Sequence, residues 1–295
     1  MFVTVLERTV SLGQHNLGTL LRTGWAYILI LVALNFTIGS ALSPSGGFTT
    51  VSYITEPVQT VDQEGLRMLA ALANILIGFS IAIAYVRRIL IDARDFPVFI
   101  GPRTFKVIVN QILLSLIGVI ALIPLAILSA ILAAVTGGLG ALLMLAAPFI
   151  SLMVVQRFSV ILPAAAVDDP LTLKESWGAT AGLGWAMAFS AFVMSLLAGC
   201  LIGIWALLLT GLGGLVPADP LWQHMRSAAF PMGVMLISVW VFASLHATFY
   251  GLIRERFAAR LGLRQADYLE ANARRSAARD KARRALSTAK RLDRR

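Results

Sequence analysis

The sequence predicts an all-α, polytopic membrane protein with about six transmembrane helices in three hairpins, joined by cytoplasmic interfacial helices. The first reason is composition: the 295 residues are 58% hydrophobic and only 14% charged, against roughly 25% charged residues in an ordinary soluble domain. The second reason is that the charges are excluded from six long apolar stretches. A soluble protein needs charged side chains over its surface, whereas a membrane protein presents apolar side chains to lipid.

Each apolar stretch is long enough to be a transmembrane helix, since about 20 apolar residues cross a hydrocarbon core roughly 30 Å thick. None of the six contains Asp, Glu, Lys or Arg. Helices are predicted because a backbone amide left unpaired in lipid costs several kcal/mol. The stretches are residues 24–41, 68–86, 107–135, 138–155, 184–209 and 229–250.

The orientation follows from the positive charges beside the spans. All Lys and Arg residues except Arg67 and Arg226 fall in segments that should share one side of the membrane: 1–23, 87–106, 156–183 and 251–295. Positively charged flanks stay in the cytoplasm, so both termini are expected there, with the chain in a bacterial cytoplasmic (inner) membrane. The first span is expected to remain uncleaved, because about 22 residues including Glu7 precede it.

Three regions are predicted along the chain. Residues 1–23 form a cytoplasmic amphipathic helix, residues 24–250 the six-helix transmembrane domain, and residues 251–295 a basic cytoplasmic tail that begins as a continuation of the sixth helix. A second interfacial helix is expected within 168–177, where Asp169 would cap free backbone amides and Pro170 would occupy the first helical position.

Few polar side chains lie within the spans. Asn35 and Asn74 are expected to bond each other across the first hairpin, as polar side chains commonly do between membrane helices. His246 is interpreted as a histidine that links helices or lies at the interface, in preference to a proton relay or substrate contact. Gly199 and Gly203 form a small-xxx-small pair that predicts close helix packing, in preference to a dimer interface.

The sequence predicts a protein that is not an enzyme and that uses no cofactor or metal. A catalytic or ion-coupled membrane protein normally keeps ionisable groups at depth, and the spans hold only His246. Cys200 is the single cysteine, and the three histidines belong to segments on opposite sides. The chain contains no phosphate-binding glycine loop, zinc-protease motif or nucleophile elbow.

Basic residues at the cytoplasmic face are the candidate contacts to anionic lipid headgroups, each worth roughly 1 kcal/mol near the surface. For the tail, two other interpretations stay open: a solvated anchor that only fixes topology, or contact with a protein partner or, least favoured, nucleic acid. The candidate headgroup residues are Arg157, Lys174, Arg254, Arg256 and Arg260.

The stretch 157–177, RFSVILPAAAVDDPLTLKESW, resembles a recurring segment of bacterial six-helix membrane proteins. In that segment an arginine and a Leu-Pro-Ala run precede a helix with a Ser-Trp pair, here Ser176-Trp177. The resemblance is to the membrane domain associated with some glycerophosphodiester phosphodiesterases and to related uncharacterised inner-membrane families. Because the catalytic barrel of those enzymes is not in this chain, the resemblance implies a membrane module and no phosphodiesterase activity.

Three functions are compatible with these features. The leading hypothesis is a non-catalytic membrane scaffold or lipid-associated module in envelope homeostasis. The second is a transporter or channel for a neutral or lipidic solute, in which kinks at Pro124 and Pro148 would form a mobile gate. The third is an accessory subunit of a membrane complex, with a membrane protein as its partner.

Overall fold

The computed structural model describes residues 2–42, 61–93, 101–136, 138–169, 171–215 and 220–261. Within these residues every regular element is an α-helix, so the predicted all-α class is confirmed. Six segments are long and apolar enough to cross a membrane. The helices are α1 (Phe2–His15), α2 (Leu17–Leu42), α4 (Val61–Ile91), α5 (Pro102–Thr136), α6 (Gly138–Phe158), α7 (Ile161–Ala166), α8 (Leu173–Ala179), α9 (Gly184–Leu215) and α10 (Pro220–Leu261).

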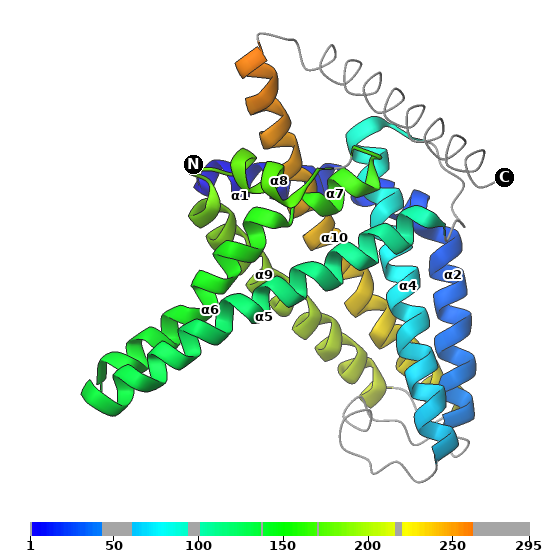
Figure 1. The fold of residues 1–295 in the computed structure, drawn as a ribbon. Coiled ribbons are helices and arrows are strands. Elements are labelled where there is room, and N and C mark those ends of the chain that lie inside the picture. The colour runs from blue at the N-terminus through cyan, green and yellow to red at the C-terminus, as the bar shows by residue number, and fades with distance from the viewer. Residues whose placement is uncertain are drawn as a thin grey trace, which may run out of the picture.

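The six long helices pack as three hairpins, α2 with α4, α5 with α6, and α9 with α10. Helix α10 is central, because it also contacts α1, α2, α4 and α7. The α5–α6 hairpin diverges from the α2–α4 hairpin, and α9 and α10 lie between them (Figure 1). The divergence leaves much of α5 without helical neighbours other than α6, which suits a helix surrounded by lipid.

The short helices α1, α7 and α8 lie across one end of the bundle (Figure 1), and we call them the interfacial layer. The amphipathic N-terminal helix ends earlier than the 1–23 boundary drawn from the sequence: α1 stops at His15 and α2 begins at Leu17. At the break, the Asn16 side chain donates a hydrogen bond to the Leu12 carbonyl at 2.9 Å. Trp240 of α10 donates to the Gly13 carbonyl at 2.8 Å, which holds α1 against the bundle.

Small residues hold α5 and α6 together. The Ser129 hydroxyl donates to the Gly140 carbonyl at 2.7 Å, and the Ser151 hydroxyl donates to the Gly118 carbonyl at 2.9 Å. A Cβ placed on Gly140 would overlap the backbone of Ala133. The two helices therefore approach backbone to backbone, as small residues allow in membranes.

The expected packing role of Gly199 and Gly203 within the chain is wrong. Both glycines are exposed, and a Cβ placed on either would meet nothing within 4 Å. Their four-residue spacing is common in apolar helices, so spacing alone does not identify which face of α9 meets a neighbour. Among the described glycines, the one whose added Cβ would overlap the backbone of another helix is Gly140 of the α5–α6 hairpin.

Candidate functional site

An apolar cavity of about 740 Å³ lies between α2, α4, α5, α7 and α10. This volume is within the range of about 300–1,000 Å³ that is typical of ligand pockets. Along α4 the lining runs from Ala70 to Val86, which corresponds to about 24 Å of helix. The cavity therefore follows the spans through most of a hydrocarbon core roughly 30 Å thick.

One face of α4 lines the cavity over several turns. Asn74, Gly78 and Ala82 are spaced four residues apart, so they lie one above another on the face that meets the cavity. Ile75 belongs to the rim and is 51% exposed. Hydrocarbon outside the helices can therefore reach the cavity from the side of α4.

The two asparagines in the cavity wall satisfy each other. The Asn35 amide donates to the Asn74 side-chain oxygen at 3.0 Å, and the Asn74 amide donates back at 3.1 Å. Asn35 also donates to the Leu31 carbonyl of its own helix at 2.8 Å. This is the link across the first hairpin that the sequence predicts, and it joins α2 to α4 beside the cavity.

His246 was expected to link helices or to lie at the interface. Its ring lines the cavity and makes an edge contact with Phe249 one turn further along α10, with 6.3 Å between ring centroids. Among the described residues, neither His246 nor the cavity-lining Gln111 forms a side-chain hydrogen bond, so no hydrogen bond of His246 to another helix is seen there. Both side chains bring hydrogen-bonding capacity into a mostly apolar space.

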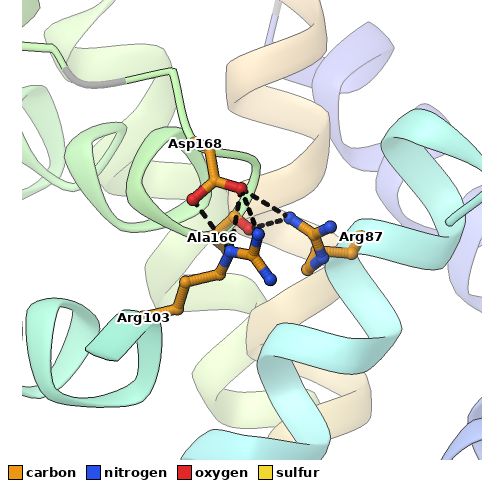
Figure 2. Close-up of polar contacts among 4 residues, drawn as sticks. All are labelled: Arg87, Arg103, Ala166 and Asp168. Carbon is orange, nitrogen blue, oxygen red and sulfur yellow. Dashed lines mark hydrogen bonds and ion pairs between the residues drawn. The ribbon is translucent and has the colours of Figure 1, made fainter. Parts of the chain in front are cut away.

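An ionic cluster lies at the interfacial layer, where α4, α5 and the turn after α7 meet (Figure 2). We call Arg87, Arg103 and Asp168 the collar. Arg103 Nε donates to both carboxylate oxygens of Asp168 at 2.8 Å, and its Nη2 lies 2.6 Å from Oδ2. Arg87 Nη1 lies 3.2 Å from Asp168 Oδ2 and donates to the Ala166 carbonyl at 2.9 Å. Because Ala166 also lines the cavity, the collar and the cavity share a wall.

The collar depends on a local turn after α7. Asp168 has a φ of 59°, in the left-handed region that Asp tolerates better than most residues. The turn projects the Asp168 carboxylate toward the ends of α4 and α5, which contribute the two arginines (Figure 2). The Arg87 side chain is only 9% exposed, and the Asp168 carboxylate and the Ala166 carbonyl are among its partners.

The neighbouring Asp169 contacts two side chains of α10, those of Tyr250 and Arg254. The Tyr250 hydroxyl donates to Asp169 Oδ2 at 2.6 Å, and Arg254 Nη2 lies 3.2 Å from that oxygen. The Arg254 guanidinium also lies 4.4 Å from the centroid of the Tyr250 ring.

Two expectations change as a result. Asp169 is not the cap of the next helix, because the N-cap of α8 is Thr172, which forms a reciprocal capping box with Glu175. Arg254 is buried and ion-paired, so it is a structural residue of the interior and not a headgroup contact.

The residues that carry the family resemblance form a clasp between α6 and α8. The Arg157 guanidinium lies 3.3 Å from the Trp177 ring centroid, and its Nη2 donates to the Trp177 carbonyl at 2.7 Å. In return, the Ser176 hydroxyl donates to the Arg157 carbonyl at 2.8 Å. In this chain, the arginine and the later Ser-Trp pair are therefore joined by direct contacts between α6 and α8.

The other candidate headgroup residues lie outside the cavity. Lys174 is exposed on α8, and Arg256 is partly exposed, with its Nη1 donating to the Ala181 carbonyl at 3.1 Å. The side chain of Arg260 and the tail from residue 262 onward lie outside the described residues. Lys174 on α8 and Arg256, bonded just after α8, therefore lie at the interfacial layer, and neither lines the cavity.

Sequence reasoning missed the two arginines of the collar. Arg87 and Arg88 are adjacent at the end of an apolar span, and the sequence around them does not distinguish their roles. In the structure, Arg88 Nη1 lies 3.0 Å from the exposed Asp92, whereas Arg87 points inward to Asp168.

Six apolar helices, with ionic contacts gathered at one end, define a multi-pass α-helical membrane protein. Comparison with known proteins adds no narrower assignment: no protein-family model, no curated protein and no solved structure matches the chain.

Proposed function

We propose that the protein is a non-catalytic, lipid-binding module of a bacterial cytoplasmic membrane, and that its cavity holds an acyl chain. The observation that carries this proposal is the apolar cavity itself, which follows the spans and has its rim on the outer surface of α4. A ligand that enters from within a bilayer must be soluble in hydrocarbon. The most abundant candidate in any membrane is the acyl chain of a lipid.

The arrangement of charges supports the proposed orientation. The described parts of the four arginine- and lysine-bearing segments all lie at the end that carries the interfacial layer (Figure 1). Positive flanks favour the cytoplasmic side, so we place the interfacial layer and the collar in the cytoplasmic leaflet. A role in envelope or lipid homeostasis, as the resemblance implies, is consistent with a protein that retains a lipid.

The alternative of a gated transporter gains less support. The two kink prolines, Pro124 and Pro148, lie within α5 and α6 and outside the cavity lining. A gate formed by these two prolines would act outside the lining of this cavity. Binding of a lipid needs no such movement.

Filling the cavity tests the proposal. We expect the purified protein to retain about one phospholipid through extraction in a mild detergent, as measured by native mass spectrometry. Ala82→Trp should abolish that retention, because residue 82 lines the cavity and an indole would occupy it. Ala71→Trp, at the exposed rim of the cavity, provides a second block at a different position of the lining.

The matched control is Ala126→Trp, which places the same indole at an exposed position of α5 outside the lining. This variant should retain lipid like the unaltered protein. Equal retention by all four proteins, or no retained lipid in the unaltered protein, would contradict the proposal.

A further inference from the structure

We propose that the cavity recognises the ester carbonyl groups of a diacyl glycerolipid, and that Gln111 and His246 donate hydrogen bonds to them. This inference rests on the proposed lipid-binding function and adds the chemical class of the lipid. It is carried by the hydrogen-bonding state of these two lining side chains, by their place at one end of the cavity, and by the lack of charged side chains among the described residues that line it.

Gln111 and His246 are the lining side chains that carry donors but form no hydrogen bond among the described residues. The other two amides of the lining, Asn35 and Asn74, bond each other. The hydroxyl of Ser238 donates to a backbone carbonyl of its own helix at 2.7 Å. A donor without an acceptor in an apolar environment is unfavourable, so Gln111 and His246 favour a ligand that brings acceptors.

Both side chains lie toward the end of the cavity at the interfacial layer. Among the lining residues of α10, His246 is the nearest to that end, one turn before Tyr250, whose hydroxyl donates to Asp169. Gln111 lies one turn after Val107, where the lining of α5 begins. One helical turn is about 5 Å, and the headgroup zone is about 5–8 Å thick on each side of a bilayer. The two donors therefore lie at the depth where the acyl chains of a lipid begin.

An ester carbonyl is the lipid group that fits this environment. No Asp, Glu, Lys or Arg is among the described residues of the lining, so a charged phosphate or ammonium would remain outside, because a charge in hydrocarbon is costly. Ester carbonyl oxygens are uncharged acceptors, and a diacyl glycerolipid has two. A glutamine amide offers two N–H donors and a neutral imidazole offers one, which is sufficient for both carbonyls of one lipid.

A competition between ester-linked and ether-linked lipids tests the inference. Purified protein freed of native lipid is incubated with equal amounts of diacyl and dialkyl phosphatidylethanolamine of the same chain length, and native mass spectrometry measures which one is retained. We expect about tenfold more of the diacyl lipid, because an ether linkage has no carbonyl oxygen and two hydrogen bonds of ordinary net strength are lost. This comparison needs no substitution in the protein.

Substitutions assign the preference to the two side chains. Gln111→Leu and His246→Leu remove donors on different helices and leave apolar side chains in their place. Each should lower the preference to about threefold, and the double variant should bring the ratio near unity while about one lipid is still retained. Ser238→Ala is the control, because Ser238 lines the same cavity but its hydroxyl already bonds within α10. This variant should keep the full preference.

The failures are separable. Equal retention of the two lipids by the unaltered protein, or a preference for the dialkyl lipid, overturns recognition of the carbonyls and leaves binding of the hydrocarbon chain standing. A preference that the double variant keeps, or that Ser238→Ala also loses, overturns the assignment to Gln111 and His246. Loss of all retained lipid in the unaltered protein overturns the proposed function itself.

Discussion

Replacing Asp169 with alanine is expected to destabilise the protein by about 3–5 kcal/mol, the usual cost of leaving one partner of a buried ion pair uncompensated. The Arg254 side chain is 9% exposed and its Nη2 lies 3.2 Å from Asp169. The variant would also remove the acceptor of the Tyr250 hydroxyl, which lies 2.6 Å away. Equilibrium unfolding of the detergent-solubilised protein in increasing SDS, followed by tryptophan fluorescence, measures the loss.

Two further variants separate this effect from a general loss of charge. Asp169→Ala combined with Arg254→Met should recover most of the stability, because an apolar side chain then replaces the unpaired guanidinium. Arg8→Ala breaks the pair with Glu255, in which both side chains are 49% exposed, and should cost at most about 1 kcal/mol. If Asp169→Ala costs no more than Arg8→Ala, the buried pair does not hold α10 to the interfacial layer.

The substitution Gly140→Leu is expected to separate the α5–α6 hairpin. Even the first carbon of the new side chain would overlap the Ala133 backbone, which cannot move aside as a flexible side chain can. The bond from Ser129 to the Gly140 carbonyl would be lost as the helices part. Overpacking of this kind costs about 1–3 kcal/mol or more, and the same SDS unfolding assay detects it.

Gly199→Leu is the matched control, because the same change is made in another long membrane helix. Residue 199 is exposed and nothing lies within 4 Å of its added Cβ, so the variant should unfold like the unaltered protein. A loss at Gly199→Leu equal to that at Gly140→Leu would show that α9 has a helical neighbour at this face, contrary to the packing described.

The fold could be predicted because a helix that crosses a membrane must be long, apolar and nearly free of charged side chains. Every span had to exclude charge, and the turn near Thr136 had to join two apolar helices without any, so helix positions and hairpin pairing followed from composition alone. The end of α1 at His15 could not be predicted from the sequence, because residues 16–23 are as compatible with helix as the residues before them. The sequence also did not show which face of each helix packs against a neighbour. Gly140 lies at a close contact with another helix, whereas Gly199 is exposed.

The site was predicted only in part. The pair of Asn35 and Asn74 could be found because two amides in apolar helices of one hairpin have few other partners. The cavity could not be found, since it depends on how side chains of five helices pack around it. Arg87 and Asp168 are distant in sequence and meet through the left-handed turn after α7.

The most direct test of lipid binding is a photo-crosslink from inside the cavity. Replacing Phe242 with p-benzoylphenylalanine puts a reactive group of similar shape on the cavity wall, and Phe192, an exposed residue of α9 outside the lining, serves as the reference position. After purification in detergent and illumination, mass spectrometry should find phospholipid attached at residue 242 and none at residue 192. No lipid at residue 242, or equal labelling at both positions, would contradict a lipid held within the cavity.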